Sequence, residues 1–146
     1  MFSKIAPLAL LATSAAAAAV PRSIDWTWQV TDFSSVCTAA TCYYSFNVAA
    51  PTGPSGQHSF DAKYCSGNSF QGDYKSCGEV GVDVPGDVLA QEFNQGIDVG
   101  AIVSVRFTFT DGEATYTYTG NTTVKHTGQG PATQFTVVPT EAFGVA

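Results

Sequence analysis

Charge is scarce in this sequence. Charged side chains make up 12% of its 146 residues, about half of the roughly 25% typical of soluble domains. The six Lys and Arg are outnumbered by twelve Asp and Glu, which gives a formal net charge of −6. A basic surface is what nucleic acids and anionic lipids attract. The balance therefore argues against a nucleic-acid-binding protein and against electrostatic docking on a membrane.

Long hydrophobic runs are also missing. The apolar run Ile5–Ala12 is too short to span a bilayer, and no later run is longer. It follows the positive charge of Lys4 and precedes the small residues Ala15–Ala19, which together have the three parts of a secretory signal. We therefore expect residues 1–19 to be a signal peptide and the protein to be secreted and extracellular.

The remaining residues, 20–146, have the length of one domain, with a mature start at Val20 or, after further trimming, at Ser23. They contain no dozen-residue stretch of helical periodicity. Strand-like runs separated by turn residues are predicted instead at 25–33, 43–50, 59–65, 73–77, 101–110, 113–119 and 134–138. The segment Leu89–Gln95 fits either a strand or a short helix capped by Asp87. The pattern predicts an all-β fold: a single-domain antiparallel β-barrel or sandwich of short strands.

One hairpin is predicted in detail. Asp111 and Gly112 separate two alternating runs, which is typical of a two-residue type I′ turn. That turn would pair Phe109 with Ala114 and Phe107 with Tyr116. These four side chains would then share one face of the hairpin, and a Thr-rich, nearly uncharged face would lie opposite.

Only four cysteines are present: Cys37, Cys42, Cys65 and Cys77. Four cysteines allow three connectivities, and a secreted chain favours disulfides. We favour Cys37–Cys42 and Cys65–Cys77, because each pair closes a short polar loop. The alternatives are a metal site or a redox thiol, but the Cys37–Cys42 spacing is not that of a CxxC motif and neither His58 nor His126 is close to a cysteine in sequence. We expect no metal and no cofactor.

Catalytic signals are weak. The G-x-S-x-G motif of a nucleophile elbow is absent, and no sequence signal places a nucleophile beside either histidine. Glycoside hydrolysis requires only two carboxylates. The candidates are Glu79, Asp83, Asp87, Asp111 and Glu113. All five lie in turn-rich segments or beside a hairpin turn, where solvated acidic residues are common. We expect no enzymatic activity.

Trp26 and Trp28 point to the same side of the first predicted strand, together with Val30. Such a pair suits either core packing or an exposed platform that stacks on sugars or on a partner. Asn121 begins the only N-glycosylation sequon, Asn121-Thr122-Thr123, which predicts an exposed position after a strand end at Gly120.

Several motifs together suggest a family. In order along the chain they are Trp26-x-Trp28-x-Val30-x-Asp32-Phe33, then Tyr43-Tyr44-Ser45-Phe46-Asn47-Val48, then Phe60 leading to Cys65, and Asp73-Tyr74-Lys75-Ser76-Cys77-Gly78. The chain resembles the small secreted fungal proteins related to the major allergen of Alternaria. Some members of that family are elicitors that provoke defence and hypersensitive cell death in plants. The resemblance implies a β-barrel or sandwich, an extracellular location and no enzymatic activity. It also supports the Cys65–Cys77 bridge and a strand at Leu89–Gln95.

This sequence departs from the allergen branch and looks more like the plant-elicitor branch. It lacks the second C-terminal bridge and the N-terminal cysteine that links two allergen chains, and it has Cys37 and Cys42 instead. We therefore expect a monomer or a weak non-covalent dimer. The expected function is a non-enzymatic secreted elicitor or effector, recognised by a plant cell-surface receptor or apoplastic protein. The alternatives are a binding module for cell-wall polysaccharide or a small aromatic ligand and, third, a carboxylate-based glycoside hydrolase.

Overall fold

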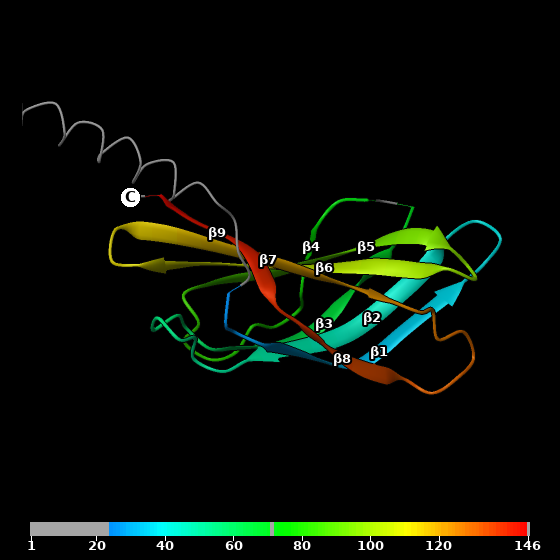
Figure 1. The fold of residues 1–146 in the computed structure, drawn as a ribbon, viewed down its shortest axis with the longest axis horizontal. Helices are drawn as coiled ribbons and strands as arrows, with labels where there is room; N and C mark the ends of the chain where they lie inside the picture. The colour runs from blue at the N-terminus through cyan, green and yellow to red at the C-terminus, as the bar shows by residue number, and fades with distance from the viewer. Residues whose placement is uncertain (1–23, 71, 146) are drawn as a thin grey trace, which may run out of the picture.

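The chain folds into two antiparallel β-sheets packed face to face (Figure 1). The computed structural model describes residues 24–70 and 72–145, so the predicted signal peptide at 1–19 lies outside the described residues. One sheet has four strands in the order β3-β2-β1-β8, and the other has five in the order β4-β5-β6-β7-β9. The strands are β1 Trp28–Cys37, β2 Cys42–Ala50, β3 Phe60–Asn68, β4 Lys75–Ser76, β5 Gly86–Gly96, β6 Gly100–Asp111, β7 Ala114–Val124, β8 Thr133–Val137 and β9 Pro139–Val145.

The predicted all-β antiparallel fold is confirmed, and it takes the form of a sandwich because the two sheets do not close into a barrel. In the described part of the chain, the structure contains no helix long and apolar enough to cross a membrane.

Alternation of apolar and polar residues explains why the sheets stack. On β1 the side chains of Trp28 and Val30 are fully buried, whereas Gln29 between them is exposed. The five-stranded sheet contributes Val105 and Phe107 in the same way. Because successive side chains in a strand point to opposite faces, each sheet has one apolar face, and the two apolar faces bury each other.

The predicted β6–β7 hairpin is present, but its predicted register is wrong by two residues. Phe107 pairs with Tyr118, Phe109 with Tyr116, and Asp111 with Ala114. The two turn residues are therefore Gly112 and Glu113, and of these only Gly112 has a positive φ, at 66°. A positive φ at the first central position is the pattern of a type II′ turn, which favours Gly there. A shift of two residues leaves every side chain on its predicted face.

Two other segments differ in how well they could be predicted. Leu89–Gln95 lies within β5, so the strand interpretation is correct and the helix interpretation is wrong.

Strand β9 was not predicted, because it begins at a proline and has little alternation. At Val138 the chain passes from the four-stranded to the five-stranded sheet. Gly120 makes room for this crossing, since a Cβ there would lie 2.7 Å from the carbonyl oxygen of Val138.

Candidate functional site

Both predicted disulfides are present. Cys37 and Cys42 occupy directly paired positions at the end of the β1–β2 hairpin, so their bridge lies within one sheet. Cys65 lies on β3 of the four-stranded sheet, and Cys77 directly follows β4 of the five-stranded sheet. The second bridge therefore joins the two sheets. Two disulfides in a small β protein are compatible with an extracellular location.

Trp26 and Trp28 belong to the core. Trp26 is 3% exposed and Trp28 is 0% exposed. Their rings pack edge to face with centroids 5.4 Å apart, and Trp26 Nε1 donates a hydrogen bond to the carbonyl oxygen of Pro51 at 2.7 Å. Side chains buried to this degree do not form an exposed stacking platform, so the core interpretation of the two tryptophans is correct.

Asn121 lies on the exposed side of β7, opposite Ser104 of β6. The predicted strand end at Gly120 is wrong, because β7 continues to Val124. The predicted exposure of the sequon is confirmed, and a glycan at Asn121 stays a prediction.

An aromatic pocket of about 260 Å³ opens between the loop after β2 and the β6–β7 hairpin. Its apolar walls are Phe109, Tyr116 and Tyr118. Gln57 shapes one side: its Nε2 donates to the hydroxyl of Tyr118 at 3.1 Å, and its Oε1 accepts from the backbone N–H of Ser55 at 2.8 Å. Asp111 also lines the pocket. Aromatic walls with a few fixed polar groups are typical of small-ligand sites.

A second pocket, of about 400 Å³, includes His58, Asp61 and Asp83. Asp83 therefore lines this pocket, whereas Asp111 lines the aromatic one. Of the other three carboxylates considered for hydrolysis, Asp87 and Glu113 are exposed, and the backbone of Glu79 forms an isolated β-bridge with that of Lys63. The structure does not bring the sequence-predicted carboxylates together in one pocket, so neither pocket contains the predicted hydrolytic pair.

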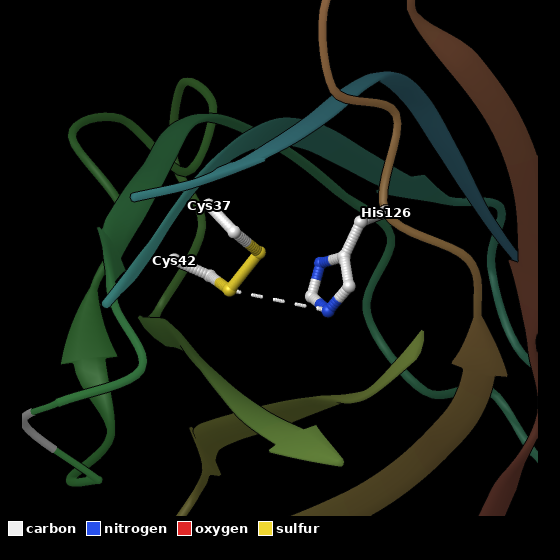
Figure 2. A group of neighbouring side chains, drawn as sticks. All are labelled: Cys37, Cys42 and His126. Carbon is white, nitrogen blue, oxygen red and sulfur yellow. Dashed lines mark hydrogen bonds between the residues drawn. A yellow bond between two sulfur atoms is a disulfide. The ribbon is translucent and has the colours of Figure 1, made fainter. Parts of the chain in front are cut away.

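His126 lies against the Cys37–Cys42 disulfide, with its Nε2 4.0 Å from Cys42 Sγ (Figure 2). Its Nδ1 is 2.7 Å from the Oγ of Ser35, and its Nε2 is 3.0 Å from Asn94 Oδ1. The amide oxygen of Asn94 can only accept, so Nε2 donates to it and Nδ1 accepts from the serine hydroxyl. The hydrogen-bonded series Ser35–His126–Asn94 has the arrangement of a catalytic relay, but Ser35 is 0% exposed, and substrate has no route to a fully buried nucleophile.

A buried carboxylate lies between the sheets on β5. Glu92 is 1% exposed; its Oε1 accepts a hydrogen bond from Ser69 Oγ at 2.6 Å, and its Oε2 has no hydrogen-bond partner. Burial and the nearby Glu92 carboxylate raise the pKa of Tyr44 to about 12. The alternation Val88, Ala90, Glu92 indicates that Glu92 faces inward, so the sequence held a signal for this group.

No sequence signal indicated that His126 would lie beside Ser35 and Cys42. His126 is separated from Ser35 by 91 residues and from Cys42 by 84, so sequence spacing does not relate these groups.

Comparisons with known proteins add no homologue: no family model, no curated protein and no solved structure matches this chain.

Proposed function

We propose that this chain is a non-enzymatic, secreted fungal elicitor or effector, which a plant cell-surface receptor or apoplastic protein recognises. The ordered motifs that resemble the Alternaria-allergen family support this proposal, as do the predicted signal peptide and the two disulfides. A cross-linked sandwich retains its surface in a protease-rich space, because local opening is what proteases require.

The observation that supports it best is the apolar tip of the β5–β6 hairpin. Ile97 and Val99 occupy the turn and are 66% and 61% exposed, and Phe93 on the adjoining strand is 59% exposed. Large apolar side chains grouped on a surface are typical of sites that bind another protein. Gly96 and Gly100, with φ of 131° and 122°, fix the turn that presents these side chains.

The experiment is leaf infiltration of purified mature protein, with cell death and the oxidative burst as readouts. We expect the folded protein to be active and a reduced, alkylated sample to be inactive. The double variant Ile97→Ser/Val99→Ser should require about ten times more protein, the loss expected when roughly 1.4 kcal/mol of binding is removed. Val82→Ser is the matched control, because Val82 is 90% exposed on a different loop and should retain full activity.

Each result has a definite meaning. Equal activity of the folded and the reduced, alkylated samples would mean that a linear epitope, and not the folded surface, is recognised. Equal activity of the Ile97/Val99 variant and the Val82 control would mean that the recognised surface lies elsewhere on the protein. Absence of a response to the folded protein in several hosts would overturn the elicitor proposal.

The aromatic pocket favours a second candidate function, the binding of a small aromatic ligand. Trp26 packs edge to face on Tyr118 of the pocket wall with centroids 5.3 Å apart, so its emission should report occupancy. A phenolic ligand should change this emission saturably in the wild type and not in Tyr116→Ala. An unchanged wild-type emission, together with no heat on calorimetric titration, would remove this candidate.

A further inference from the structure

We propose that Cys37, Cys42 and His126 form a site for a zinc-class divalent metal ion when the Cys37–Cys42 disulfide is reduced. Their three ligand atoms, two Sγ and one imidazole nitrogen, all lie within 4.8 Å of one another. In the described part of the chain, no other group of three His, Cys, Asp or Glu side chains is close enough to hold a metal. This proposal is independent of the elicitor function.

The distances suit a tetrahedral centre after small movements. Zinc bonds of about 2.3 Å to sulfur and about 2.0 Å to nitrogen place neighbouring ligand atoms roughly 3.5 to 3.8 Å apart. Cys42 Sγ and His126 Nε2 are already 4.0 Å apart (Figure 2). Cleavage of the S–S bond lets the two sulfurs separate by side-chain rotation. Two thiolates with one imidazole are a donor set that selects zinc over magnesium or calcium.

The backbone holds the three ligands together without the disulfide. Cys37 and Cys42 are paired in the β1–β2 ladder, and the turn between them is closed by the Thr38 N–H, which donates to the Thr41 carbonyl at 2.7 Å. The loop that contains His126 is attached to β1 separately: the N–H groups of Thr127 and Gly128 both donate to the Ser35 carbonyl at 3.0 Å. Reduction should therefore leave the ligands in place.

The surroundings of His126 supply what a ligating histidine requires. When Nε2 binds a metal, Nδ1 carries the proton and can donate to the Ser35 Oγ, which lies 2.7 Å away. A hydrogen bond from the second ring nitrogen to a fixed acceptor orients the ring and is nearly universal at metal-bound histidines. Asn94 Oδ1, which lies 3.0 Å from Nε2, would lose its hydrogen bond from the ring in this tautomer.

The chemistry balances with an external dithiol as the reductant. The dithiol supplies two electrons and two protons to the S–S bond, and it becomes a disulfide itself. The metal ion then displaces both thiol protons, which pass to solvent, and the resulting bis-thiolate centre has no net charge. Cys37 is partly exposed, whereas Cys65 and Cys77 are both buried, so a reductant should reach the Cys37–Cys42 bridge first.

The test is a Co²⁺ titration of the full chain after limited reduction with a phosphine, which becomes the phosphine oxide with oxygen from water. Alkylation and mass mapping should find Cys37 and Cys42 free and Cys65–Cys77 intact. We expect thiolate-to-cobalt charge-transfer absorption in the reduced protein, competition by Zn²⁺, and a rise in the melting temperature with Zn²⁺. The oxidised protein should show none of these effects.

Two histidine variants form a matched pair. His126→Ala should weaken Co²⁺ binding by roughly tenfold or more, and His58→Ala, which removes the other histidine, should leave it unchanged. Equal binding by the two variants, or binding that survives in Cys37→Ser/Cys42→Ser, would overturn the proposal. So would opening of Cys65–Cys77 before Cys37–Cys42, or unfolding on reduction, detected as a red shift of the emission of the buried tryptophans.

Discussion

At the scale of single residues, Tyr44 and Glu92 are two ionisable side chains that are both buried in the core. Tyr44 is 3% exposed, and its hydroxyl donates to the carbonyl of Ala90 at 3.3 Å. An ionised phenol there would lose its hydration and would face the carboxylate of Glu92. These are the two causes, in that order, that raise the pKa of Tyr44 to about 12.

This pKa shift predicts a specific loss of stability in alkali. In the unfolded chain tyrosine loses its proton near pH 10, whereas in the folded protein Tyr44 keeps it until about pH 12. Between these values the unfolded state binds fewer protons, so the free energy of unfolding falls as the pH rises through this window. Tyr44→Phe should reduce that pH dependence, by an amount on the order of 2 kcal/mol at the upper end.

Urea unfolding at several pH values between 9 and 12 measures the effect. Tyr64→Phe is the matched control, because it removes the same hydroxyl from a side chain that is 66% exposed. An identical alkaline slope in the wild type and in Tyr44→Phe would show that Tyr44 ionises equally in the folded and unfolded states.

At the scale of elements, the β6–β7 turn depends on one backbone angle. Gly112 has a φ of 66°, and a Cβ added there would meet no atom within 4 Å. Gly112→Ala should therefore destabilise the protein by about 1 kcal/mol through backbone strain alone. Glu113, the other turn residue, is exposed and has no positive φ, so Glu113→Ala should be close to neutral. Thermal unfolding compares the two variants, and equal melting temperatures would contradict the turn geometry.

The same hairpin shows what sequence patterns can and cannot predict. Period-two alternation predicted which side chains face inward on β6 and β7, because burial enforces that period. It could not predict the register, since a shift of two residues satisfies the same pattern, and the choice between a type I′ and a type II′ turn decides between them. Strand β9 was missed because its own residues alternate little and because its pairing with β7 depends on the crossing at Val138, for which Gly120 makes room.

The candidate sites also differ in how far the sequence alone could predict them. The disulfides follow from short loops between neighbouring strands, so local sequence was sufficient to predict them. The contact between His126 and Cys42 joins residues 84 apart and depends on the loop after β7 returning to β1. The aromatic pocket likewise needs the loop after β2 to meet the β6–β7 hairpin. Contacts of this kind are set by the topology, which the local patterns of a single sequence do not reveal.

At the scale of the whole molecule, the two disulfides differ in which parts of the fold they connect. Cys37–Cys42 links positions that the β1–β2 ladder already pairs, whereas Cys65–Cys77 connects one sheet to the other. The loops also differ, with sequence separations of 5 and 12 residues. The chain-entropy model gives about 2 kcal/mol for the shorter loop and about 3 kcal/mol for the longer. Both considerations rank the inter-sheet bridge as the more stabilising.

We therefore expect Cys65→Ser/Cys77→Ser to lower the melting temperature by roughly 10 °C, and Cys37→Ser/Cys42→Ser to lower it by less. The β1–β2 hairpin should remain closed in the second variant, because the Thr38 side chain accepts from the N–H groups of Ala40 and Thr41 in the turn. Calorimetry of the two variants beside the wild type measures the difference. A larger loss from the Cys37/Cys42 variant would mean that the β1–β2 turn, rather than the connection between sheets, limits the stability of the sandwich.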